Sequence, residues 1–107
     1  MNDMEMIVFE IISNGGDAKG LAYEAIAAAE TGEFEKAEEL LKEADESLLR
    51  AHHIQTDLIQ KEAAGEHTDV NVIFVHAQDH LMTAIEVRTL AETFIKLNKR
   101  LFALENK

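Results

Sequence analysis

The sequence contains no cysteine, no proline and no tryptophan, and only five of its 107 residues are glycine. Without cysteine the chain can form no disulfide and no thiolate metal site, and it has no cysteine nucleophile. Proline and glycine are the residues that most strongly interrupt helices, so little in this chain would break one. These absences favour an all-α fold.

Positive charge is also scarce, because 10 lysines and arginines face 21 aspartates and glutamates, for a formal net charge of -11 at pH 7. Nucleic acids and anionic membrane surfaces repel such a chain, which leaves a protein, a small molecule or a cation as the expected partner. No stretch approaches the roughly 20 consecutive apolar residues of a membrane-spanning helix. The first twelve residues carry acids where a secretory signal would carry bases. We therefore expect a cytoplasmic protein.

Hydrophobic residues make up 47% and charged residues 29% of the chain, the balance of one folded domain, which we expect to span residues 1–107. Polar residues and glycine interrupt the apolar pattern at Thr31-Gly32-Glu33 and at residues 65–69. The three segments between these breaks predict helices at about 3–31, 34–64 and 71–104. Asn2 and Glu5 have the spacing of a capping pair at the start of the first helix. Short connections make the expected fold an antiparallel three-helix bundle.

Each segment shows apolar residues at steps of three and four, the period of one helical face. In the first segment the interior pair Gly15-Gly16 predicts either a kink or a close helix contact. In the second segment the apolar residues form one continuous row along the helix, here called the seam, and Gln55 is the one polar residue in it. The third segment has enough apolar residues to pack on two sides, which favours a homo-oligomer; the additional ones are Ile85, Val87, Ile95, Leu97 and Phe102.

The polar residues His76, Asp79, His80 and Thr83 fall at i, i+3, i+4 and i+7, so they share one face of the third helix. A buried histidine or aspartate is costly unless it is hydrogen-bonded, paired or bound to a cation. The simplest interpretation is structural, with both histidines satisfied inside the bundle. This polar face is otherwise the best candidate for a functional site.

Three functional interpretations remain open from the residues alone. A neutral imidazole of His76, about one turn into its helix, can accept a phosphoryl group where the helix dipole favours negative charge. Alternatively His76, Asp79 and His80 all coordinate one metal ion, although Ala77 occupies the place of the glutamate in a zincin motif and argues against hydrolytic zinc chemistry. In the third interpretation the polar stripe only sets the register of a non-catalytic helical oligomer.

The whole chain resembles enzyme IIA of the lactose/cellobiose (N,N′-diacetylchitobiose) family of the bacterial phosphoenolpyruvate-dependent sugar phosphotransferase system. The similarity runs nearly end to end, and the most specific of its motifs is the last of three. The three stretches are Ile12-Ser13-Asn14-Gly15-Gly16-Asp17-Ala18-Lys19, Ala51-His52-His53-Ile54-Gln55-Thr56 and Val75-His76-Ala77-Gln78-Asp79-His80-Leu81-Met82-Thr83.

This resemblance implies a phosphohistidine relay, in which phosphorylated HPr donates a phosphoryl group to His76 and His76 passes it to the cognate IIB protein or domain. The pathway would take up and phosphorylate a disaccharide of the cellobiose, lactose or chitobiose class. It also implies a nine-helix homotrimer, in which Asp79 from each subunit meets at the threefold axis around a divalent metal ion, usually magnesium. A hard cation with oxygen ligands would offset the repulsion among three buried carboxylates.

The remaining polar residues near this face have weaker assignments. His80 could orient His76 from one turn away. His52 is expected to join a buried network with Gln55 that reaches the site. Gln78 lies roughly 200° around the helix from His76, which makes it a weak candidate. His53 and His67 are expected to be exposed without a role, whereas an apolar patch for a partner could come from Ile73, Phe74 and Met82.

Overall fold

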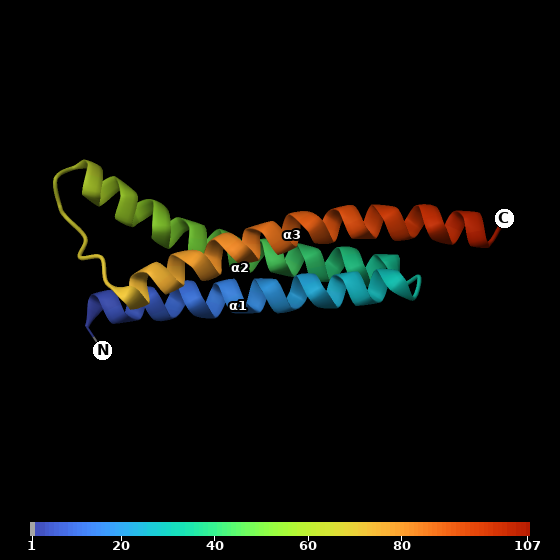
Figure 1. The fold of residues 1–107 in the computed structure, drawn as a ribbon, viewed down its shortest axis with the longest axis horizontal. Helices are drawn as coiled ribbons and strands as arrows, with labels where there is room; N and C mark the ends of the chain where they lie inside the picture. The colour runs from blue at the N-terminus through green and yellow to red at the C-terminus, as the bar shows by residue number, and fades with distance from the viewer. Residues whose placement is uncertain (1) are drawn as a thin grey trace.

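The computed structural model describes residues 2–107, which form three helices: α1 (Asp3–Glu30), α2 (Phe34–Ala63) and α3 (Val72–Glu105). Figure 1 shows that α2 runs antiparallel to both neighbours, so that α1 and α3 point the same way. The molecule measures 60 × 25 × 20 Å. The described residues contain no strand, and each helix starts and ends within one residue of its predicted bounds, which confirms the all-α three-helix fold.

Side chains cap the starts of α1 and α3. The Oδ1 atom of Asn2 accepts the backbone N–H of Glu5 at 2.8 Å, and its Nδ2 donates to Glu5 Oε1 at 3.2 Å, so the predicted capping pair is confirmed. Asn71 Oδ1 likewise accepts the backbone N–H of Phe74 at 2.8 Å. Each cap satisfies a backbone donor that has no partner inside its helix, and thereby sets where the helix begins.

Glycines end α1 and α2 at the two predicted breaks. Gly32 has φ +81 and Gly65 has φ +95, a left-handed conformation that glycine adopts without steric cost. The residue after Gly32, Glu33, donates its backbone N–H to the carbonyl of Ala28 at 2.9 Å, and Glu66 does the same to Lys61 at 2.9 Å. This is the Schellman pattern, which satisfies the last carbonyls of a helix and reverses the chain.

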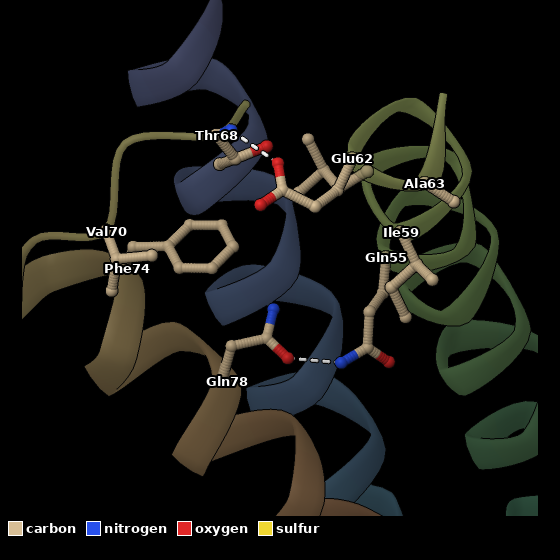
Figure 2. Close-up of a pocket in the computed structure, with 9 residues that line it drawn as sticks. Gln55, Ile59, Glu62, Ala63, Thr68, Val70, Phe74 and Gln78 are labelled. Atoms are coloured by element: carbon tan, nitrogen blue, oxygen red, sulfur yellow. Dashed lines mark hydrogen bonds between the residues drawn. The ribbon is translucent and has the colours of Figure 1, made fainter. Parts of the chain in front are cut away.

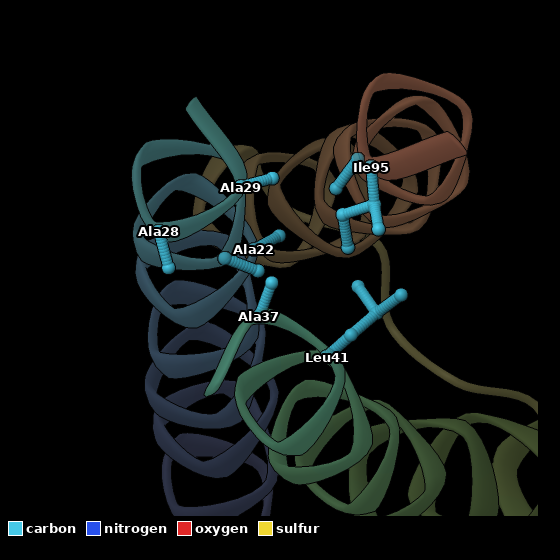
Figure 3. Packing of buried hydrophobic residues seen from close by; sticks show 8 residues of the cluster. Ala22, Ala28, Ala29, Ala37, Leu41 and Ile95 are labelled. Carbon is cyan, nitrogen blue, oxygen red and sulfur yellow. The ribbon is translucent and has the colours of Figure 1, made fainter. Parts of the chain in front are cut away.

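The core is built largely from alanine, and α1 lies against both other helices along its length (Figure 1). Eleven of the seventeen buried hydrophobic residues among residues 2–107 are alanines. Figure 3 shows how closely the helices approach at the α1–α2 turn, where Ala22, Ala29 and Ala37 meet the larger Leu41 and Ile95. Because alanine buries little area, this core stabilises the single chain less than one of leucine and isoleucine would.

The first half of α2 is tied to α3 by charged side chains, whereas its second half diverges from α3 (Figure 1). Arg88 on α3 donates to both carboxylate oxygens of Asp45 on α2, from Nε at 2.6 Å and Nη2 at 3.0 Å, and from Nη1 to Glu92 at 2.5 Å. The hydrogen bond to Asp45, with that to Glu92, raises the pKa of Arg88 although partial burial opposes the shift. The bond from Arg88, with its positive charge, lowers the pKa of Glu92.

As predicted, α3 carries apolar residues beyond those that face the core. Most of them, however, are not the residues that the sequence indicated. Ile95 is buried in the core, Phe102 packs edge-to-face on Phe34, and Ile85 and Val87 lie partly buried against the core clusters. Leu97 and Phe102 are the exposed members of the predicted set, and Leu97 has no comparable aromatic partner. Leu97 faces outward. It belongs to an exposed stripe at steps of three and four, opposite the core: Leu90, Phe94, Leu97, Leu101 and Leu104. None of the three helices contains a stretch long and apolar enough to cross a bilayer, within the residues described.

Candidate functional site

His76 lies in the second turn of α3 with its side chain exposed. One turn further on, the ring of His80 meets it edge-to-face, with 5.4 Å between ring centroids and 89° between ring planes. The i, i+4 spacing of the two residues brings them together, as the sequence predicts. An edge-to-face neighbour limits the orientations open to the His76 ring while leaving it accessible from outside.

His80 is the partly buried member of this pair. Its Nδ1 atom is fully buried and has no hydrogen-bond partner among residues 2–107. An unpaired buried polar atom costs about 1–3 kcal/mol, so its presence beside an exposed histidine needs a reason. A functional role for the pair, or a further molecule covering this face, would supply one.

Gly15 of α1 brings the backbone of α3 close behind His80. A Cβ atom added to Gly15 would lie 3.8 Å from the carbonyl carbon and oxygen of His80 and 3.7 Å from Leu81 Cα. Alanine would therefore fit in ordinary van der Waals contact, whereas any longer side chain would push the helices apart. Of the two predictions for the glycine pair, a close helix contact is confirmed at Gly15.

Asp79 and Thr83 complete the predicted polar face, and both are exposed in the single chain. The Thr83 hydroxyl donates to the backbone carbonyl of Asp79 at 2.8 Å, so it is satisfied within its own helix. The Asp79 carboxylate makes no hydrogen bond or ion pair with any described residue. It points away from the core and is available to something outside this chain.

Metal binding within one chain has no structural basis in residues 2–107, since no three histidine or acidic side chains there are placed to hold an ion. The interpretation in which His76, Asp79 and His80 share one metal ion therefore lacks a ligand set. Asp79 alone offers a hard oxygen donor of the kind magnesium prefers. A site built on it fits only if several chains each contribute a carboxylate.

A cavity of about 540 Å³ opens where α2 diverges from α3, on the side of α3 away from His76. In Figure 2 Phe74 and Val70 form one wall and Ile59 and Ala63 the other. Gln55 donates a short hydrogen bond to Gln78 across one end of it. Gln78 thus bridges to α2, in agreement with its predicted placement away from His76.

One prediction about the surrounding polar residues is wrong. His52 is exposed and takes no part in a buried network, because Ala51 occupies the seam and the next residue is rotated by about 100° toward solvent. Gln55 has Gln78 as its partner instead. His53 and His67 are exposed, as predicted.

A polar cluster that was not predicted from the sequence lies between α1 and α2. Ser47 is 3% exposed, and its hydroxyl accepts from Arg50 Nη2 at 3.0 Å, while Arg50 Nε donates to Asn14 Oδ1 at 3.0 Å. Ser47 stands three residues after Ala44 and four before Ala51, so its spacing could have placed it in the seam. Of the three residues expected to form an apolar patch, Ile73 and Met82 are 62% and 52% exposed, and Phe74 lines the cavity. Ile73 and Met82 are nine residues apart and lie on opposite sides of α3, so the three residues do not form one patch.

The arrangement defines a class of protein: a small helical bundle with an exposed histidine, His76, whose ring lies edge-to-face against that of the partly buried His80. The family model described as the lactose/cellobiose-specific IIA subunit of the PTS (phosphotransferase) system matches residues 6–99. The chain belongs to this family, and is thus a IIA component of the sugar phosphotransferase system, which confirms the resemblance inferred from its motifs.

Individual relatives agree with this assignment. The chain is 50% identical over 106 residues to the cellobiose-specific EIIA component of Lactococcus lactis subsp. lactis (strain IL1403), with 99% of this chain and 91% of that protein covered. The crystal structure of the PTS cellobiose-specific enzyme IIA from Bacillus anthracis superimposes with a TM-score of 0.93, at 48% identity, covering 96% of this chain and 94% of that one. The IIA(Chitobiose) chain in the solution structures of its complex with HPr, from the Escherichia coli phosphotransferase system, has a TM-score of 0.81 at 36% identity, covering 94% and 98%.

Proposed function

We propose that this protein is a cytoplasmic phosphocarrier in which His76 accepts a phosphoryl group from phosphorylated HPr and passes it to a cognate IIB protein. The observation that carries the proposal is the exposed His76 ring, which lies against His80 in a chain that the IIA family model matches over residues 6–99. The first transfer breaks the bond between phosphorus and HPr and forms a nitrogen–phosphorus bond at His76, and the second breaks that bond and forms one to the accepting atom of IIB. The chain therefore needs a reachable imidazole and no redox cofactor.

The local geometry suits a relay between two proteins. An exposed ring can be approached in line by a donor and then by an acceptor, with the contact surface excluding water at each step. His76 lies close to the N-terminal end of α3, where the helix dipole favours the negative charge of a phosphoryl group. His80 is proposed to orient the His76 ring, since the two rings touch.

The uncovered face of α3 supports a homotrimer of nine helices. Sixteen large hydrophobic residues among residues 2–107 are exposed, more than a monomer needs, and the Leu90–Leu104 stripe has the three-and-four spacing of a helix–helix seam. Asp79 lies on the same outward face. In a trimer built on this face, three Asp79 carboxylates would converge and hold a divalent cation, for which Mg²⁺ is the proposed ion.

The names of the relatives support an assignment of the sugar that this pathway transports. The Lactococcus lactis and Bacillus anthracis proteins are named for cellobiose and the Escherichia coli protein for chitobiose. We infer a disaccharide of the cellobiose, lactose or chitobiose class, with cellobiose favoured. The complex of the Escherichia coli relative with HPr supports HPr as the donor.

A reconstituted relay tests the proposal. With labelled phosphoenolpyruvate, enzyme I, HPr and the IIB protein, label should reach IIB only when this chain is added. The variant His76→Ala should stop the label at HPr while keeping its helical circular dichroism. Label that reaches IIB through His76→Ala would refute the assignment of His76.

A further inference from the structure

The cavity between α2 and α3 is walled by apolar side chains that remain exposed. Ile59 and Val70 are 61% and 70% exposed, and they lie on opposite sides of it (Figure 2). Phe74 packs partly against the core and turns its ring toward the space between them. The volume of about 540 Å³ falls in the range of roughly 300–1,000 Å³ that is typical of small-molecule sites. Size and walls therefore suit a small ligand.

A polar group stands at each end of this cavity. At one end Gln78 accepts a hydrogen bond from Gln55 through Oε1, which leaves its own N–H groups toward the cavity (Figure 2). At the other end the Glu62 carboxylate accepts the backbone N–H of Thr68 through Oε2 at 3.0 Å, while its Oε1 lies 3.4 Å from His67 Nδ1. A ligand that spans the cavity would meet a hydrogen-bond donor at one end and a carboxylate at the other.

The carboxylate end carries an excess of negative charge. Residues 62–69 include three acids, Glu62, Glu66 and Asp69, and no lysine or arginine. The Glu62 side chain is 51% exposed, so a ligand can reach it from the mouth of the cavity. Charge complementarity therefore favours a cationic group at this end and disfavours an anionic one.

The cavity lies away from the surfaces that the proposed function uses. Gln78 and Phe74 lie about 100° and 140° round α3 from Asp79, in the direction opposite to His76. Neither the proposed trimer axis nor a protein that reaches His76 needs to cover this side of the helix. The cavity is therefore a separate feature of the fold.

We propose that this cavity binds a small amphipathic amine, a molecule with an ammonium group, an aromatic body and a hydrogen-bond acceptor at its far end. The ammonium group pairs with Glu62, the aromatic body lies against Phe74, and the acceptor takes an N–H of Gln78. An apolar side chain from a second copy of this chain fits less well, because it would offer nothing to the carboxylate or to the amide.

Tyramine is a suitable probe, because it carries an ammonium group and a phenol oxygen at opposite ends of one aromatic ring. In an NMR titration of the isotope-labelled full chain, we expect saturable shifts of the side-chain amides of Gln55 and Gln78 and of the backbone amide of Thr68. A Kd of about 1 mM is expected for a ligand of this size. The matched probe 3-(4-hydroxyphenyl)propionate has a carboxylate in place of the ammonium group and should bind about tenfold more weakly.

Two variants test the two ends of the ligand separately. Glu62→Gln keeps an oxygen for the Thr68 N–H but removes the charge, so the Kd for tyramine should rise about threefold. Glu105→Gln makes the same change at the exposed end of α3 and should leave it unchanged. Wild type should bind tyramine about fivefold more tightly than phenethylamine, which lacks the phenol oxygen, and Gln78→Leu should abolish this preference.

Several results would overturn the proposal: equal binding of tyramine and the propionate, an unchanged Kd in Glu62→Gln, or shifts that do not saturate. Contacts between the Phe74 ring and a differently labelled second chain would show that a neighbouring copy fills the cavity, and would overturn it as well. None of these measurements involves phosphoryl transfer, so their failure leaves the proposed function standing.

Discussion

At the scale of single residues, the site is a pair of histidines with different surroundings. His76 is exposed and able to meet a partner, whereas His80 is partly buried with an unsatisfied Nδ1 and touches the first ring. The close approach of Gly15 fixes the backbone behind His80. The exposed ring is therefore the proposed reacting group, and we propose that the partly buried ring positions it.

Replacing the second histidine tests this division of roles. In His80→Gln we expect phosphoryl transfer through His76 to slow roughly tenfold, about 1.4 kcal/mol in activation free energy, because the His76 ring loses its neighbour. Rapid-quench kinetics with phosphorylated HPr would measure the rate, and unchanged circular dichroism would show that folding is intact. A variant as fast as wild type would make His80 a packing residue only.

At the scale of helices, local signals determine where each element begins and ends, and a few long-range contacts determine how they sit together. The asparagine caps and the two left-handed glycines bound the helices. Arg88 then joins α3 to Asp45 of α2, 43 residues earlier in the chain, and to Glu92 on its own helix. This network holds together the half of α2 that stays close to α3.

The Arg88 network gives the fold a pH dependence with a defined sign. Because Arg88 lowers the pKa of Glu92 below its ordinary value of 4.5, the carboxylate adds stability above that pH, and this is lost as the pH falls through the lowered pKa. Glu92→Gln should therefore be less stable than wild type at pH 7, and the difference should shrink as the pH falls below about 4.5 in thermal melts. A difference that is constant with pH would contradict this, and Glu39→Gln, at an exposed residue of α2, is the control.

The sequence could predict the elements and the site's face, because both depend on local spacing. Helix bounds and the capping pair at Asn2 follow from neighbouring residues. The glycine pair predicts either a kink or a close helix contact, and the contact at Gly15 is made with His80 and Leu81 of α3. The divergence of α2 and the unpaired His80 Nδ1 depend on how whole helices pack, which spacing alone does not specify. His52 is exposed because its neighbour Ala51 takes the seam, and Ser47 is buried in that seam although it was not among the predicted seam residues.

At the scale of the whole molecule, the single chain buries mostly alanine and exposes many larger apolar side chains. This distribution is what a subunit of an assembly has before its partners cover it. The Leu90–Leu104 stripe of α3 and Asp79 face one direction, and we propose that this direction points to the axis of a trimer. His76 lies on an exposed face of the same helix and would remain within reach of a donor protein.

Removing the proposed axial charge tests the assembly. In Asp79→Leu we expect a trimer that still forms and no longer responds to chelator, since replacing buried, mutually repelling carboxylates by apolar groups ranges from neutral to about 4 kcal/mol stabilising. Sedimentation velocity with and without EDTA would measure both properties. Dissociation of Asp79→Leu into monomers would mean that the metal-bound carboxylates hold the subunits together.

The most direct test of the central claim is the intact mass of the protein after incubation with phosphoenolpyruvate, enzyme I and HPr. The account predicts one added phosphoryl group of about 80 Da per chain, removed by brief acid treatment and absent from His76→Ala. A wild-type mass that does not change while HPr is phosphorylated, or an equal gain in His76→Ala, would contradict it.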